Sequence, residues 1–126
     1  MAESVDQNQI HALVQDWAKA VRAKDMAGAL AHHTEDIVMF DVPMPLQSNG
    51  IEEYESTWKL FFDSSPGGAG SFELTELQIT AGETVAYVHA ILCIGDSSGR
   101  LTMGLRKDGG RWLIAHEHHS YPLELA

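Results

Sequence analysis

The chain has 126 residues, the length of one domain, and 44% of them are hydrophobic, as in an ordinary globular protein. Its 18 acidic and 8 basic residues give a formal net charge of -10, which argues against nucleic acid as a partner because a polyanion would be repelled. No apolar run approaches the roughly 20 residues of a membrane helix, so no membrane partner is expected.

The N-terminal segment and the cysteine content predict a cytoplasmic protein. The first ten residues, MAESVDQNQI, lack both the basic and the apolar region of a signal peptide. The single cysteine, Cys93, has no intrachain disulfide partner and lies between two aliphatic residues, which predicts a buried thiol in a reducing compartment. A chain of this length buries enough surface to fold unaided, so no cofactor or structural metal is expected.

The first half of the chain is predicted to be mainly helical. One helix is expected over residues 5–24, where apolar residues recur at helical spacing: Ile10, Leu13, Val14, Trp17 and Val21. A short second helix is expected over about residues 25–33, and a third over residues 50–63. Between the last two, the stretch EDIVMFDV (35–42) has the composition of a strand that ends at Pro43.

From Ser71 onward the pattern is that of strands. Alternation slips by one residue between Leu74 and Leu77, which predicts a β-bulge near Thr75–Glu76 and therefore a bent sheet that can cup a cavity. Residues 83–94 are apolar on both faces, as in a central strand. Strands over 99–107 and 111–120 follow, joined by the turn KDGG. Helices followed by strands predict an α+β domain with a four-stranded antiparallel meander.

The turn length in KDGG decides where two basic residues point. A two-residue turn, which Asp-Gly favours, puts Arg100 and Arg106 outside, whereas a three-residue turn puts them beside the histidines of the last strand.

The last strand, RWLIAHEHHS (111–120), carries three histidines. Strict alternation places Glu117 and His119 on one face, and on the other Trp112, Ile114, His116 and His118. The second set begins apolar and ends polar, which is typical of a strand that leaves the core along a pocket wall. It therefore predicts His116 and His118 as catalytic candidates and Trp112 and Ile114 as pocket residues.

Three interpretations of His116 and His118 stay open. They are acid–base or other polar groups of a pocket, hydrogen-bonded structural histidines, or two ligands of a metal. The metal interpretation needs at least a third ligand, from His33 or His89, and nothing in the sequence brings those residues together.

Asp41, in MFDVPMP, is the third catalytic candidate. It lies at the end of an apolar strand and before a proline-rich loop. Partial burial there would raise its pKa and make it a base or a neutral donor. The alternative is a carboxylate that accepts hydrogen bonds from the loop's backbone N–H groups.

The other candidates for a ligand pocket lie on the helices or in mid-strand. They are His33, Tyr54, Trp58, Tyr87 and His89. Each has an alternative as a core residue, and the two tyrosine hydroxyls need partners if they are buried.

Taken together, these features resemble the SnoaL-like, ketosteroid-isomerase-related proteins of the nuclear-transport-factor-2-like superfamily. The features that carry the resemblance are the helical first half, the strand ending in FDVPMP, the Gly-led helix with Trp58, the pair Arg100 and Thr102, and the closing DGGRWLIAHEHHSYP. The resemblance covers nearly the whole chain and implies one domain over residues 1–126. The implied fold is a cystatin-like roll: a curved antiparallel sheet around a cone-shaped cavity, packed against three N-terminal helices. It also implies a homodimer through the sheet face.

The function implied is a small-molecule pocket. The hypothesis is an isomerase, cyclase or dehydratase that performs acid–base chemistry on a small apolar carbonyl compound without a cofactor. The alternative is a non-catalytic ligand-binding or assembly module, because one fold hosts many functions. Steroid isomerases combine an aspartate base with a tyrosine and a protonated aspartate. That trio is absent at matching positions, so the resemblance implies only Asp41, His116 and His118 as polar pocket residues.

Overall fold

The computed structural model describes residues 2–125, with side chains from residue 5 onward. Three helices and six strands follow one another along the chain: α1 (Ala2–Arg22), α2 (Met26–Leu30), β1 (His33–Phe40), β2 (Ser48–Asn49), α3 (Ile51–Ser64), β3 (Glu73–Ala81), β4 (Val85–Ile94), β5 (Ser97–Asp108) and β6 (Arg111–Ser120). The expected helices and the four strands of the meander are therefore present, with bounds that differ by a few residues.

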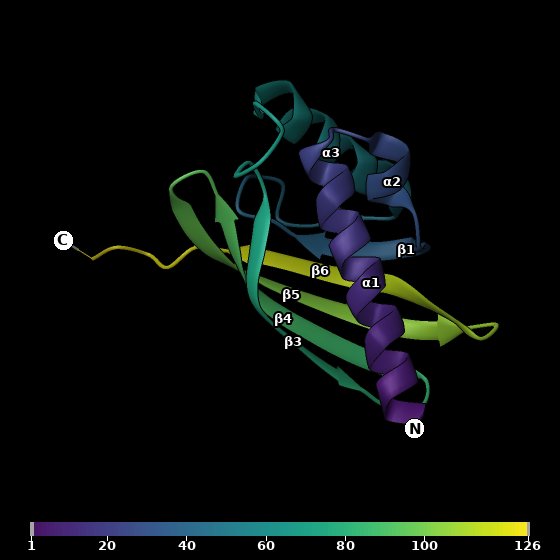
Figure 1. Cartoon of the computed structure of the whole chain (residues 1–126). Helices are drawn as coiled ribbons and strands as arrows, with labels where there is room; N and C mark the ends of the chain where they lie inside the picture. The colour runs from purple at the N-terminus through teal and green to yellow at the C-terminus, as the bar shows by residue number, and fades with distance from the viewer. Residues whose placement is uncertain (1, 126) are drawn as a thin grey trace.

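The strands form one sheet in the order β2-β1-β6-β5-β4-β3. Strands β3 to β6 are the predicted antiparallel meander, and the helices cover one face of the curved sheet (Figure 1). The α+β architecture with a curved sheet is thus confirmed. The parallel pairing of β1 with β6 and the short strand β2 were not predicted. We call the face under the helices the inner face and the opposite one the outer face.

The predicted bulge in β3 is present. The register with β4 shifts between Thr75 and Gln78, and Glu76 has a φ of 54°. A non-glycine residue in this left-handed region is uncommon and is a frequent mark of a break in the ladder. The bulge bends the edge of the sheet, as the sequence indicated.

A second bulge, in β6, was not predicted. Leu105 pairs with Ile114, but the next pair is Gly104 with His116, so Ala115 is an extra residue without a partner on β5. The extra residue reverses the alternation. Ile114 and Glu117 are both fully buried, whereas His118 is exposed. The expectation that Ile114, His116 and His118 share one face was therefore wrong.

The hairpin between β5 and β6 has the expected two-residue turn. Asp108 pairs with Arg111 across Gly109 and Gly110, whose φ values of 58° and 78° suit a turn of the I′ type. Arg106 consequently lies on the surface, where it pairs with Asp36 at 3.0 Å.

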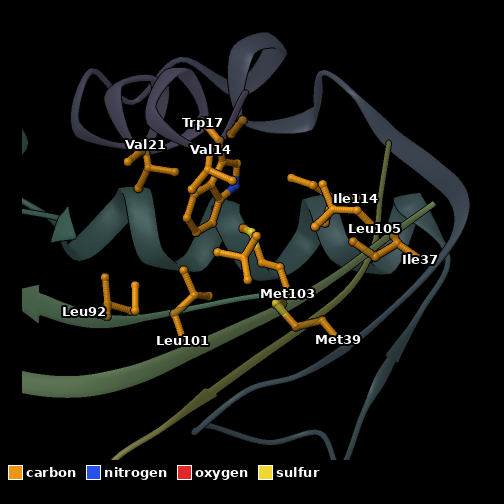
Figure 2. Close-up of a cluster of buried hydrophobic side chains, with 14 of the residues drawn as sticks. Val14, Trp17, Val21, Ile37, Met39, Leu92, Leu101, Met103, Leu105 and Ile114 are labelled. Carbon is orange, nitrogen blue, oxygen red and sulfur yellow. The ribbon is translucent and has the colours of Figure 1, made fainter. Parts of the chain in front are cut away.

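The core lies between α1 and the inner face of the sheet. Val14, Trp17 and Val21 face side chains from the strands, which include Leu92, Leu101 and Met103 (Figure 2). Full burial of an aliphatic or aromatic side chain contributes about 1.5–3 kcal/mol, so this contact holds the helix on the sheet. None of the helices in the described part of the chain has the length and apolar character needed to cross a bilayer.

Candidate active site

A pocket of about 440 Å³ opens at one end of the inner face. Its walls are the loop after β1, one side of α3, and the ends of β4 and β6. Most lining side chains are apolar, among them Trp58, Phe61 and Phe72. The ionisable side chains on its wall are Asp41, His119 and Tyr121. A mainly apolar pocket of this size with a few polar groups is typical of a site for a small organic molecule.

Asp41 reaches the pocket because β1 ends at Phe40 and a proline-containing loop follows. Its Oδ1 accepts a hydrogen bond of 2.8 Å from the Val42 N–H, and the side chain is 27% exposed. Within residues 5–125, no donor contacts its Oδ2. The carboxylate is thus fixed through one oxygen and keeps the other free.

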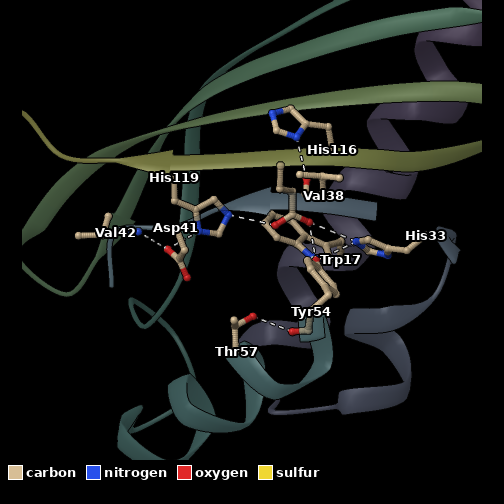
Figure 3. Close-up of polar contacts among 10 residues, drawn as sticks. Trp17, His33, Val38, Asp41, Val42, Tyr54, Thr57, His116 and His119 are labelled. Carbon is tan, nitrogen blue, oxygen red and sulfur yellow. Dashed lines mark hydrogen bonds and ion pairs between the residues drawn. The ribbon is translucent and has the colours of Figure 1, made fainter. Parts of the chain in front are cut away.

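His119 lies between two carboxylates (Figure 3). Its Nδ1 is 3.4 Å from Asp41 Oδ1, and its Nε2 is 3.0 Å from Glu117 Oε2. Burial alone would lower the pKa of His119, but the hydrogen bonds and charges of Asp41 and Glu117 outweigh it and raise this pKa to about 9. The rings of Trp17 and Trp58 pack beside the imidazole, with centroids 6.5 and 6.1 Å away.

Glu117 is the centre of a buried network behind His119. Its Oε1 accepts a short hydrogen bond from the Tyr54 hydroxyl and lies 3.2 Å from His33 Nε2. Burial would raise the pKa of Glu117, but the hydrogen bonds and charges of His119 and His33 lower it to about 2. Burial, and then the charge of Glu117, raise the pKa of Tyr54 well above its ordinary value, so its hydroxyl remains a donor.

Two further contacts fix the back of this network. Trp17 Nε1 donates to the Tyr54 hydroxyl over 3.2 Å, and His33 Nδ1 donates to the Ala31 carbonyl over 2.7 Å. The network therefore joins α1, β1, α3 and β6, and it ends at the pocket through His119 and Asp41.

Tyr121, directly after β6, lines the pocket next to this network. Its ring lies flat on Gly99, where a Cβ atom would come within 2.8 Å of Tyr121 Cε1. Burial raises the pKa of Tyr121, and the charges of Asp41 and then Cys93 raise it further, so the hydroxyl stays protonated. Gly99 thus leaves room for a neutral hydrogen-bond donor near Asp41.

The predicted site residues divide into three groups. Asp41 and Trp58 line the pocket, as expected. His33 and Tyr54 lie behind it in the network and do not line it. Trp112 and Ile114, predicted as pocket residues, belong to the core instead, and the Trp112 indole donates to Asp6 over 3.1 Å.

His116 and His118 lie outside the pocket, which corrects their expected placement. His116 projects from β6 on the side opposite His119, and its Nδ1 donates to the Val38 carbonyl over 2.7 Å (Figure 3). The rings of both histidines contact the edge of Phe40. The bulge at Ala115 is the cause, because it turns these two side chains to the outer face.

Tyr87 and His89 are likewise on the outer face and not in the pocket. Tyr87 is 52% exposed, and His89 lies in a shallow groove over β3, β4 and β5. Among the described residues, no group of three or more His, Cys, Asp or Glu side chains is arranged to hold a metal ion. The potential third ligands His33 and His89 lie on opposite faces of the sheet from one another.

Sequence reasoning missed Glu117, His119 and Tyr121. The polar run HEHHS has no apolar residue to reveal which face is buried, so a slip of alternation inside it leaves no sign. Tyr121 follows the strand and gave no pattern at all. The one available signal was the phase slip in β3, since a bend in one strand of a meander is often matched by a bend in another.

Solved structures with this fold come from several bacteria. An NTF2-like protein of unknown function from Pseudomonas putida KT2440 is 32% identical, with a TM-score of 0.87 over 97% of this chain and 90% of that one. A protein of unknown function with a cystatin-like fold from Nostoc punctiforme is 16% identical, with a TM-score of 0.80 over 96% and 94%. A protein from Novosphingobium aromaticivorans, provisionally named a scytalone dehydratase, is 16% identical, with a TM-score of 0.76 over 97% and 91%. The last two likenesses concern the fold alone.

No protein with a curated description matches the sequence significantly. The family model described as a SnoaL-like domain matches residues 10–124, which include the pocket, the buried network and all six strands. The resemblance that the sequence suggested is therefore confirmed, and the chain belongs to the SnoaL-like domain family.

Proposed function

We propose that the pocket binds a small, largely apolar carbonyl compound and that Asp41 removes a proton from the carbon next to the carbonyl. The observation that carries this proposal is the free Oδ2 of Asp41 on the wall of a mainly apolar pocket. A carboxylate in such surroundings is poorly solvated, which favours proton transfer to it.

Tyr121 is the candidate donor to the oxygen of the bound compound. When the C–H bond breaks, its electron pair moves toward the carbonyl and leaves an enolate oxygen. A neutral hydroxyl aimed at that oxygen stabilises the developing charge. The raised pKa of Tyr121 keeps its proton in place up to alkaline pH. Returning the proton from Asp41 to another carbon gives an isomerisation, and loss of a β-hydroxyl as water gives a dehydration.

Deuterium exchange tests the proton transfer without the natural substrate. The bicyclic ketone 2-tetralone fits a pocket of this volume and has acidic protons beside its carbonyl. In D₂O the protein should accelerate exchange of these protons, measured by NMR. Asp41→Asn should lower the rate by about 10²-fold or more, since a positioned base contributes that much. Tyr121→Phe should also lower it by about 10²-fold, as for the loss of an oxyanion donor.

His118→Asn, a change on the outer face, is the matched control and should exchange at the wild-type rate. Exchange that is equally fast in Asp41→Asn and in the wild type would refute Asp41 as the base.

The second candidate is a binding protein without catalysis. It is favoured by the fact that both ring nitrogens of His119 are already engaged by carboxylates. In this case 2-tetralone or a related ketone binds, as seen in chemical-shift changes of pocket residues, but its protons exchange no faster than in buffer.

The outer face of the sheet is the candidate surface for a homodimer. Val85 and Tyr87 on β4 are 63% and 52% exposed there, and exposed apolar residues on one face favour association. Light scattering should give twice the chain mass of 13.8 kDa. Tyr87→Lys should yield the monomer, and the control Leu60→Lys, at the pocket rim, should leave the dimer intact.

A further inference from the structure

The imidazole of His119 is held in a way that is unusual for a proton-transferring histidine. Both of its nitrogens face carboxylate oxygens, Nδ1 that of Asp41 and Nε2 that of Glu117. An ionised carboxylate only accepts hydrogen bonds, so two such contacts require a proton on each nitrogen. The ring is therefore a cation with no nitrogen left for a ligand.

Glu117 is held more firmly than an ion pair with His119 alone requires. Besides His119, it contacts the Tyr54 hydroxyl and His33 Nε2, and its side chain is fully buried. Tyr54 is tied in turn to Trp17, and His33 to the Ala31 carbonyl. A buried carboxylate with three donors has one position and one charge state, because either change would leave donors without partners.

We propose that Glu117 is a positioning residue of the pocket, which keeps His119 as a fixed imidazolium, so that Asp41 and not His119 takes up the proton of the bound compound. The part that concerns Asp41 rests on the proposed function. The part that concerns Glu117 and His119 is a property of the protein without ligand.

The surroundings of His119 support a fixed cation. Within the described residues, Asp41 and Glu117 are the charged side chains at ion-pair distance from it. The remaining neighbours from α1 and α3 are the indole rings of Trp17 and Trp58, which carry no charge. Its pairing neighbour on β5 is Leu101. No neighbouring cation opposes the protonated ring, and the charge of His33 reaches it only across Glu117.

Histidine NMR on the ligand-free protein tests this directly. Protein with ¹⁵N-labelled histidine is titrated from pH 5 to pH 10 in roughly half-unit steps, and the His119 signals are assigned by their loss in His119→Gln. In the wild type both ring nitrogens should remain protonated through neutral pH, and the ring should titrate near 9. In Glu117→Gln, which keeps the size and removes the charge, the titration should move toward the ordinary value of 6.5.

Two further variants separate a specific effect from a general one. Glu124→Gln removes one carboxylate charge from the exposed C-terminal segment and should leave the titration of His119 at its wild-type value. Tyr54→Phe keeps the Glu117 charge and should leave His119 protonated at neutral pH. If Glu117→Gln does not fold, the wild-type titration decides alone: a midpoint near 6.5 overturns the proposal, and one near 9 with both nitrogens protonated supports it.

The pH profile of exchange completes the test. The wild-type rate should show no step between pH 6.5 and 9, because His119 does not change charge below its pKa of about 9. Glu117→Gln should gain such a step. A wild type that catalyses no exchange would refute the proposed function but leave the NMR result standing. Catalysis with a neutral His119 would refute the role of Glu117 and leave Asp41 as the base.

Discussion

The inner and outer polar residues at the end of β6 differ although they are neighbours in sequence. On the inner face, Glu117 and His119 are buried and have partners on every side. On the outer face, His116 has one backbone partner and His118 has none among the described residues. Burial explains the difference, because a polar group removed from water without a partner costs free energy, whereas an exposed one finds water. Histidine content alone therefore says little about where chemistry takes place.

Replacing Glu117 should break the inner half of this comparison most severely. Glu117→Leu removes the acceptor of three donors and leaves His119 as a buried cation with one partner. We expect a loss of about 3–5 kcal/mol in the free energy of unfolding, as for a broken buried ion pair. Urea denaturation at pH 6 measures it. His118→Leu, on the exposed outer face, should change stability by less than about 0.5 kcal/mol. A similar small effect for both would mean that the inner network contributes nothing.

The pH dependence of stability should also come from the inner pair. The pKa of His119 is raised from 6.5 to about 9, so its contribution is complete below pH 6.5 and is lost as the pH rises through 9. The pKa of Glu117 is lowered from 4.5 to about 2, so its contribution is complete above pH 4.5 and is lost as the pH falls through 2. Each loss is on the order of 3 kcal/mol.

Urea denaturation at a series of pH values should therefore give highest stability between pH 4.5 and 6.5. In His119→Gln the decline above pH 6.5 should disappear, whereas in His118→Gln it should remain. A decline that persists in His119→Gln would assign it to another group.

Two tyrosines give a gentler version of the same comparison. Tyr54 donates to Glu117 and is fully buried, whereas Tyr87 is 52% exposed on the outer face. Tyr54→Phe should cost about 1.5–3 kcal/mol, the contribution of a hydrogen bond to a charged group, and Tyr87→Phe close to nothing. The same denaturation experiment measures both. Equal effects would show that burial of the hydroxyl does not set its contribution.

The two bulges show what the sequence can and cannot predict. In β3 the slip is flanked by apolar residues, Leu74 and Leu77, and their change of phase reveals it. In β6 the slip at Ala115 is followed by HEHHS, in which every residue is acceptable on either face. The element order and the meander could therefore be predicted, but the facing of the residues that matter most could not.

The other gaps have a similar cause. Asp41 was found because a proline-rich loop marks the end of its strand. The parallel pairing of β1 with β6, which brings His33 and Asp41 to the same network, connects residues some 80 positions apart and leaves no local pattern. Tyr121 depends on Gly99 in another strand, a contact that only the fold establishes.

The smallest expected effect lies within the outer face itself. His116 donates to the Val38 carbonyl over 2.7 Å, whereas His118 makes no hydrogen bond among the described residues. His116→Ala should therefore cost about 1 kcal/mol, the net contribution of an ordinary hydrogen bond, and His118→Ala less than about 0.5 kcal/mol. Differential scanning calorimetry on the two variants resolves such a difference. Because Val38 lies on β1 and His116 on β6, a cost for His116 alone would show that even the outer face helps to hold the one parallel pair of the sheet together. Equal costs would assign that pairing to the inner residues only.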